Sequence, residues 1–302
     1  MNKVKSNLTA YSYLSPALLS IFFLTLLPVV YTVYISFTNY NLYHLDDYDF
    51  VGLKNYQTLL GGAIQEVFFS VLLWTIVFAA LSTLLAYATG MGLAVLLNNP
   101  LMKESKIYRS ILIIPWALPA MIALLSWQGL LNEQYGGINQ VLTALGFAEG
   151  LPWMTDAFWA RTGIILVNIW LGFPFMMSIC LGSLQSIPPT LYEVANVEGA
   201  SRWHAFRRIT LPLTLKVSLP LVVASFASNF NNFGNIYMIT QGGPAKVNSP
   251  FAGSTDILAS MVYKMTVWSN RYDLSATLSI VIFAIVGVLT LVNLRLSGAF
   301  KE

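Results

Sequence analysis

Charged residues are scarce in this chain: they make up 10% of its 302 residues, whereas hydrophobic residues make up 56%. About 25% of the residues of a soluble domain are charged, and they cover its surface. The shortage of charge therefore excludes an ordinary soluble fold. We predict an all-α integral membrane protein.

Cysteine and histidine are also rare. The single cysteine, Cys180, excludes an internal disulfide and a multi-cysteine metal site, and its apolar surroundings indicate a buried packing residue. The two histidines, His44 and His204, fall in loops predicted to lie on opposite sides of the membrane, so they cannot share a metal ion. No grouping of serine, histidine and carboxylate indicates hydrolysis. The sequence predicts no metal site and no catalytic residue, so we do not expect an enzyme.

A phosphate-binding loop is missing too, because the pattern G-x-x-x-x-G-K-[ST] and even the dipeptide Gly-Lys do not occur. The chain is therefore not expected to bind ATP in that way or to hold a cofactor of its own. The interiors of its apolar segments lack Asp, Glu, Lys, Arg and His, which proton-driven carriers place at mid-membrane. A transporter of this composition is either passive or driven by a partner.

What the chain does have is long apolar segments, and about 20 mostly apolar residues suffice to cross a bilayer as a helix. The first segment follows Lys3 and Lys5 like a signal peptide, but it exceeds the roughly 7–15 apolar residues of one, and no cleavage pattern follows. We expect it to be retained. Residues 1–302 are predicted to form one transmembrane domain with six spans: about 14–37, 67–97, 110–131, 162–184, 213–240 and 274–295.

Lysine and arginine predict the orientation, because cytoplasmic segments carry an excess of both. With the N-terminus placed inside, the inner segments hold eleven: Lys3, Lys5, Lys103, Lys106, Arg109, Arg202, Arg207, Arg208, Lys216, Arg295 and Lys301. The outer segments hold five: Lys54, Arg161, Lys246, Lys264 and Arg271. Both termini and the loop 185–212 are therefore predicted to be cytoplasmic.

That inner loop carries a motif, since residues 193–212 read EVANVEGASRWHAFRRITLP. It resembles the EAA loop of ABC importer permeases, whose pattern is E-A-A, three residues, G, nine residues and I-x-L-P. The one departure is valine at position 194. The matching residues are Glu193, Ala195, Gly199, Ile209, Leu211 and Pro212.

The resemblance implies that this loop docks on an ATPase subunit and couples it to the membrane spans. Gly199 is expected to permit a sharp turn between two short helices. Pro212 is expected in the first turn of the returning span. The three arginines of the loop are expected to contact the ATPase or the anionic inner leaflet: Arg202, Arg207 and Arg208.

Two spans carry small, polar and aromatic residues at helical spacing. One stripe is Asn168, Leu171, Gly172 and Phe175; the other is Ser225, Ser228, Asn229 and Asn232. An amide buried in a bilayer needs partners, so these side chains face protein or a water-filled cavity. Spacing alone leaves two readings open: the amides bond to neighbouring helices, or they bind the hydroxyls of a sugar. In the second reading Phe175, Phe226 and Phe230 would cover the sugar rings.

The strings NIWLGFPFM at 168–176 and SFASNFNNFGNIYMITQGGP at 225–244 resemble the substrate-lining segments of the larger permease subunit of maltose importers. The resemblance implies that the eight residues of the two stripes contact sugar. Phe175 stands where that family has tyrosine, and Ser228 where it has phenylalanine, so the sugar itself is left open.

The sequence thus predicts a type I ABC importer permease fold with six transmembrane helices and a cytoplasmic coupling helix, in a bacterial or archaeal cytoplasmic membrane. Its expected substrate is a di- or oligosaccharide such as maltose or maltodextrin. The implied partners are a second homologous permease, a pair of ATPase subunits holding ATP and magnesium, an extracellular sugar-binding protein and membrane lipid, without nucleic acid. The alternatives are another small solute, such as glycerol-3-phosphate, and a passive channel.

Overall fold

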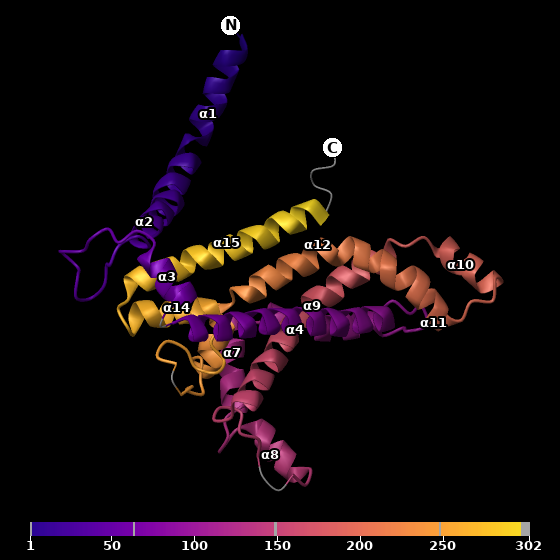
Figure 1. The fold of residues 1–302 in the computed structure, drawn as a ribbon. Coiled ribbons are helices and arrows are strands. Elements are labelled where there is room, and N and C mark those ends of the chain that lie inside the picture. The colour runs from indigo at the N-terminus through magenta and orange to yellow at the C-terminus, as the bar shows by residue number, and fades with distance from the viewer. Residues whose placement is uncertain (1, 63, 148–149, 248, 297–302) are drawn as a thin grey trace. The chain divides into compact units, whose positions relative to one another are not determined.

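The fold is all-helical in the computed structural model, which describes residues 2–62, 64–147, 150–247 and 249–296 (Figure 1). Within these residues the only β-type pairs are two isolated bridges, Thr38 with Phe50 and Asn41 with His44. The chain divides into two compact units. Unit 1 comprises residues 1–68 and 261–284, and unit 2 comprises residues 69–260 and 285–302.

Five helical stretches of the described chain are long and apolar enough to cross a membrane, and a bent pair brings the number to six. The five are Tyr11–Ile35, Gln65–Leu97 (α4), Ala157–Gln185 (α9), Arg202–Phe230 and Tyr272–Arg295, the last within α15 (Tyr272–Leu296). The bent pair is Ser105–Ala117 with Ala120–Leu130. The prediction of an all-α membrane protein with six spans is confirmed in its helical content and number of candidate spans.

The segment 110–131, expected as one span, is two helical pieces that meet at 90°. The first ends with α6 (Ile114–Ala117), and the second is α7 (Ala120–Leu130). Leu118 between them is extended, with φ −74° and ψ 143°, because the ring of Pro119 disfavours the helical conformation of the preceding residue. The sequence contained this signal, and hydropathy alone overlooked it.

The helix after the inner loop begins at α11 (Arg202–Ala205) and continues through a π-helical turn, η2 (Phe206–Thr210), into α12 (Leu211–Phe230). Pro212 is the second residue of α12 and so lies in its first turn, as expected, although α11 and η2 run into α12 without a break. The N-terminal stretch has the same arrangement of a π-helical turn before a Leu-Pro pair. There η1 (Phe22–Leu26) precedes Leu27 and Pro28, as η2 precedes Leu211 and Pro212. A wider turn relieves the clash of a proline ring with the preceding turn.

The segment 213–240, also expected as one span, ends its long helix at Phe230. A new helix, α13 (Phe233–Thr240), starts after a break at Asn231 and Asn232. Asn232 caps it, because its side-chain oxygen accepts a hydrogen bond from the Asn235 N–H at 3.3 Å. The described chain thus has two interrupted helices in unit 2, at 118–119 and at 231–232.

The core of unit 2 is a close contact between α4 and α9. A Cβ atom on Gly90 would come within 2.5 Å of the Met177 backbone nitrogen, so only glycine fits there. Ala86 and Ala94, four residues to either side, are buried on the same face. Small residues at this spacing let helix backbones approach closely in a membrane.

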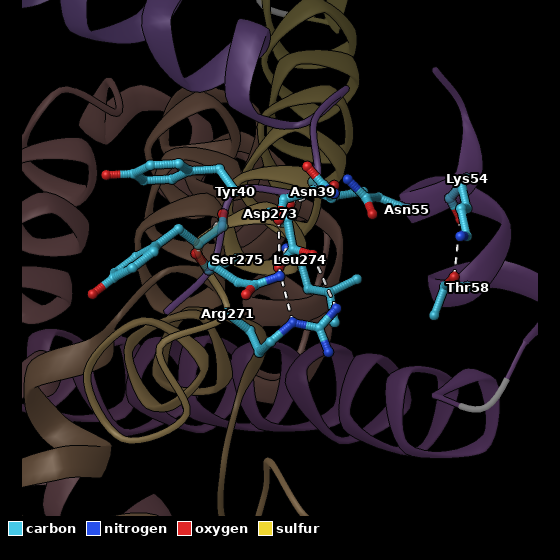
Figure 2. A network of polar contacts seen from close by, with 12 residues as sticks. Asn39, Tyr40, Lys54, Asn55, Thr58, Arg271, Asp273, Leu274 and Ser275 are labelled. Atoms are coloured by element: carbon cyan, nitrogen blue, oxygen red, sulfur yellow. Dashed lines mark hydrogen bonds and ion pairs between the residues drawn. The ribbon is translucent and has the colours of Figure 1, made fainter. Parts of the chain in front are cut away.

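Unit 1 is held by a polar network around the start of α15 (Figure 2). Asp273 is 2% exposed, and Arg271 donates to both of its carboxylate oxygens at 3.0 and 2.9 Å. The Asp273 backbone N–H donates to the Tyr40 carbonyl at 2.9 Å. The Asn55 amide donates to the carbonyls of Ser36 and Thr38 at 3.0 and 2.7 Å. These bonds fix the segment that follows α2 (Leu27–Ile35) against α3 (Lys54–Gly61) and α15.

A second polar network lies in the loop between α7 and α9, around the Glu133 carboxylate. The Glu133 carboxylate accepts hydrogen bonds from the backbone N–H groups of Met154 and Thr155, at 2.6 and 2.7 Å, and from the Thr155 hydroxyl. Burial alone would raise the pKa of this carboxyl, but the three donors outweigh it and lower the pKa. The loop is therefore tied by an ionised group.

Candidate functional site

The two stripes of polar and aromatic residues meet on one cavity of about 460 Å³ in unit 2. α9 contributes Asn168, Leu171, Gly172 and Phe175, and α12 contributes Ser225, Ser228 and Asn229. Asn232 joins them from the break before α13. The cavity therefore brings together all eight residues that the sequence singled out as substrate contacts.

The structure adds residues that the spacing of two helices could not reveal. They come from α4, from the bent α6–α7 segment and from α13: Ser82, Ala86, Pro115, Trp116, Leu118, Ala120 and Asn235. No charged residue is among the lining residues, so the wall offers amides, hydroxyls, aromatic rings and alkyl groups.

Three asparagines of the cavity wall and Thr83 of α4 form a ladder of hydrogen bonds across four helices. The Asn229 amide donates to the Thr83 hydroxyl at 2.9 Å, and the Asn168 amide donates to the Asn229 carbonyl oxygen at 3.0 Å. The Asn235 amide donates to the Asn168 carbonyl oxygen. These bonds link α4, α12, α9 and α13. They satisfy part of each amide, which has two N–H donors and an oxygen with two lone pairs.

Other polar groups at the cavity have donors or acceptors without a hydrogen-bond partner in the described residues. Within the described part of the chain, the hydroxyls of Ser225 and Ser228 form no hydrogen bond, and the Asn232 amide nitrogen has no acceptor. The cavity thus combines amides held in place by their neighbours with donors and acceptors that a ligand can use. The two readings of the asparagines, helix contact and ligand contact, are compatible in this geometry.

The aromatic side chains at the cavity are Phe175 and Trp116, stacked with ring centroids 6.5 Å apart and an angle of 22° between the rings. The expectation for the other two phenylalanines is wrong: Phe226 is not among the lining residues, and Phe230 is 1% exposed within the core. Trp116 reaches the cavity because the chain bends at Leu118 and Pro119. The proline pair at positions 115 and 119 was the available signal.

The predicted turn of the inner loop lies at Gly199, after α10 (Pro189–Val197) and before α11. Gly199 has a φ of +77°, a conformation that glycine adopts readily. Its N–H donates to the Asn196 carbonyl at 3.1 Å, and the Ala200 N–H donates to the Ala195 carbonyl at 2.9 Å. This is the Schellman pattern, which ends a helix by satisfying its last carbonyls. The expected sharp turn is present.

The six motif residues divide into an inner and an outer set. Ala195 is buried, and Ile209 and Leu211 pack against the core between α4 and α9. Glu193, Gly199 and Pro212 are exposed, as are all three arginines of the loop. A shallow depression of about 560 Å³ lies at the turn, lined by Glu198, Gly199, Ser201, His204 and Arg208 among others. One side of the loop is thus packed against the protein core, and the other side is exposed.

Among the described residues, no three His, Cys, Asp or Glu side chains are grouped so that they could hold a metal ion. Cys180 is buried in the core, as its apolar surroundings predicted.

Comparison with known proteins places the chain in a family. Residues 86–298 match the family described as binding-protein-dependent transport system inner membrane component. The galactooligosaccharides transport system permease protein GanP of Bacillus subtilis is 38% identical over 296 residues, which is 97% of this chain and 71% of that protein. The maltodextrin transport system permease protein MalC of Streptococcus pneumoniae is 37% identical over 302 residues, or 96% of this chain and 69% of that one.

A solved structure shares the fold. A bacterial ABC transporter involved in the import of the acidic polysaccharide alginate superposes with a TM-score of 0.80 over 100% of this chain and 99% of that chain, at 22% identity. The six candidate spans, the loop that resembles the EAA motif and the matches over nearly the whole chain agree with one another. The chain belongs to the binding-protein-dependent transport system inner membrane components, and it is a transmembrane permease subunit of an ABC importer.

Proposed function

We propose that this permease carries a neutral di- or oligosaccharide of the maltodextrin or galactooligosaccharide kind across the membrane. The observation that carries the proposal is the cavity, where five residues from two helices and a helix break present neutral polar groups beside a stacked aromatic pair. Relatives named for galactooligosaccharide and maltodextrin transport support the sugar class.

The chemistry of the wall fits a saccharide. Sugar hydroxyls donate and accept hydrogen bonds, and so do the amides and hydroxyls of Asn168, Ser225, Ser228, Asn229 and Asn232. The ladder of amides preorganises two of them, which lowers the entropy lost on binding. Phe175 and Trp116 offer apolar faces to the C–H faces of sugar rings, and Leu171 and Gly172 leave space beside them. An anionic solute such as glycerol-3-phosphate would find no cationic partner on this wall.

The energy for transport is assigned to partner subunits. In this proposal a pair of ATPase subunits, holding ATP and magnesium, docks on the exposed side of the turn at Gly199. Glu193 and Arg208 are exposed there for contact, and Ile209 and Leu211 transmit the motion to the α4–α9 core. A second homologous permease completes the pathway, and an extracellular binding protein delivers the sugar. Both termini lie in the cytoplasm, in accordance with the distribution of lysine and arginine.

Uptake into vesicles that contain the assembled complex tests the substrate class. The probes are maltotriose, a β-linked galactotriose, an alginate trisaccharide and glycerol-3-phosphate, each supplied with the binding protein and with ATP inside the vesicles. We expect ATP-dependent uptake of one of the two neutral trisaccharides and none of the two anionic probes. Equal uptake without ATP would contradict the assignment of energy. Uptake of an anionic probe alone would contradict the neutral sugar.

A further inference from the structure

One fully buried polar group at the cavity has no hydrogen-bond partner among the described residues. Ser82 lies in α4 at the cavity wall and is 0% exposed, and its hydroxyl oxygen forms no hydrogen bond within the described residues. A buried hydroxyl without a partner destabilises a protein. In a helix, serine and threonine usually bond the carbonyl four residues earlier. Thr75 of the same helix does so, donating to the Val71 carbonyl at 2.7 Å.

The residue next to Ser82 in α4 does form a hydrogen bond with another helix. Thr83, the next residue, accepts the amide of Asn229 and so belongs to the ladder. Two other spanning-helix residues, Ser183 and Thr214, also have buried hydroxyls without partners, but neither is among the lining residues of the cavity. Among the residues that line the cavity, Ser82 therefore combines a buried hydroxyl group with the lack of a hydrogen-bond partner in the described part of the chain.

We propose that Ser82 is a specificity-determining residue, which hydrogen-bonds one hydroxyl group of the transported saccharide. The inference rests on the proposed function and extends the site to α4, beyond the two stripes on α9 and α12. Ser82 both donates and accepts, as a sugar hydroxyl requires. Because the wall closes over its oxygen in this conformation, the contact forms after a small outward movement of the wall on loading.

Monodeoxy sugars provide the test, because each lacks one hydroxyl that Ser82 could bind. Uptake of maltotriose and of β-linked galactotriose, with the monodeoxy derivatives of whichever is imported, is measured for the wild-type complex and for Ser82→Ala. We expect the variant to import the parent sugar about two- to tenfold less efficiently, the effect of one lost neutral hydrogen bond. One monodeoxy derivative should be imported poorly by the wild type, and the variant should treat it like the parent.

Ser183→Ala is the matched control, since it removes a buried, unpartnered hydroxyl from a spanning helix away from the cavity. It should leave uptake of every sugar unchanged. Thermal unfolding of both complexes separates the roles, because removing an unpaired hydroxyl should leave the melting temperature unchanged or slightly raised. A lowered melting temperature for Ser82→Ala, with uptake reduced equally for all derivatives, would overturn the proposal in favour of a structural role.

The failures are distinguishable. If Ser82→Ala imports every derivative as the wild type does, while changes at Asn232 impair uptake, the role of Ser82 is wrong and the proposed function stands. If the wild-type complex imports neither neutral trisaccharide, the proposed function fails and the role of Ser82 fails with it.

Discussion

The turn at Gly199 is built from neighbours in the sequence, whereas the cavity draws on side chains from Ser82 to Asn235. At the turn, two backbone hydrogen bonds and one glycine conformation define the geometry. At the cavity, four helices contribute to one amide ladder. The turn depends on a local conformation, so one backbone change should destroy it. The cavity depends on shared contacts, so single changes there should have graded effects.

The largest effect is expected at the turn. Gly199→Val places a β-branched residue at a φ of +77° and should abolish sugar-stimulated ATP hydrolysis by the complex while membrane insertion persists. A Cβ atom there meets nothing within 4 Å in this chain, so the loss would come from backbone strain or from the docked partner. Gly199→Asn separates the two, because asparagine tolerates this conformation. Coupling that survives in the asparagine variant assigns the loss to strain.

Gly146→Val is the matched control for that experiment. Gly146 has a φ of +96° in the loop between α7 and α9, and a Cβ atom there also meets nothing within 4 Å. Its replacement imposes similar backbone strain away from the coupling loop, so ATP hydrolysis and uptake should stay near normal. If Gly199→Val hydrolyses ATP in response to the loaded binding protein, the docking role of the turn is wrong.

At the cavity, Asn168→Ala should have the largest consequence. Asn168 is 6% exposed and lies in the middle of the ladder, so its removal leaves the Asn229 carbonyl oxygen without its donor and the Asn235 amide without its acceptor. Each buried polar group left unpaired costs about 1–3 kcal/mol. We expect a lower melting temperature and a lower yield of assembled complex, together with reduced uptake. A complex of normal stability and normal uptake would contradict both roles of this amide.

Asn232 offers a smaller and cleaner change. Asn232→Ser keeps a good cap for α13 but removes the amide nitrogen of this lining residue, which has no acceptor among the described residues. Uptake should fall about two- to tenfold with the melting temperature unchanged. Asn232→Ala is the comparison variant, because it also removes the cap and should cost a further ~0.5–2 kcal/mol of stability. Unchanged uptake in the serine variant would remove Asn232 from the sugar site.

The smallest effect is expected outside both regions, at Glu133. Its pKa is lowered in the folded state, so its contribution to stability is present above the unfolded value near 4.5 and is lost as the pH falls through the lower folded value. Glu133→Gln should speed hydrogen exchange of the segment 150–156 at neutral pH by a few-fold, with little change in uptake. Asp156→Asn is the control, because it removes a nearby charge but keeps the cap of α9. It should leave the hydrogen-exchange rate of this segment unchanged.

Much of the coupling turn could be predicted from the sequence. The motif spacing places Glu193, Gly199 and Ile209, and the glycine turn follows from backbone sterics that act within a few residues. The π-helical turn that joins α11 to α12 just before Pro212 was not predicted, because it depends on the conformation of the preceding turn.

The stripes on α9 and α12 were also visible, since helical periodicity puts their residues on one face of each helix. The sequence did not show that these faces of α9 and α12 meet at one cavity, or which other residues complete the cavity wall. Both depend on the packing of segments distant in the sequence. Trp116 enters the cavity through the bend at Leu118, and Asn235 enters through the break at Asn232. Hydropathy averages over both interruptions, so it predicted two straight spans instead.

The sequence by itself determined the membrane environment, the helical class and the glycine turn of the inner loop, because composition, hydrophobic length and local backbone preference are properties of the chain alone. Only the tertiary structure decided the use of the polar groups. Asn168 became the centre of a ladder because two other helices, α12 and α13, brought partners to it, whereas Ser82 met none among the described residues. A hydrogen bond depends on the distance and angle between two groups, and packing sets both when the groups lie far apart in the chain.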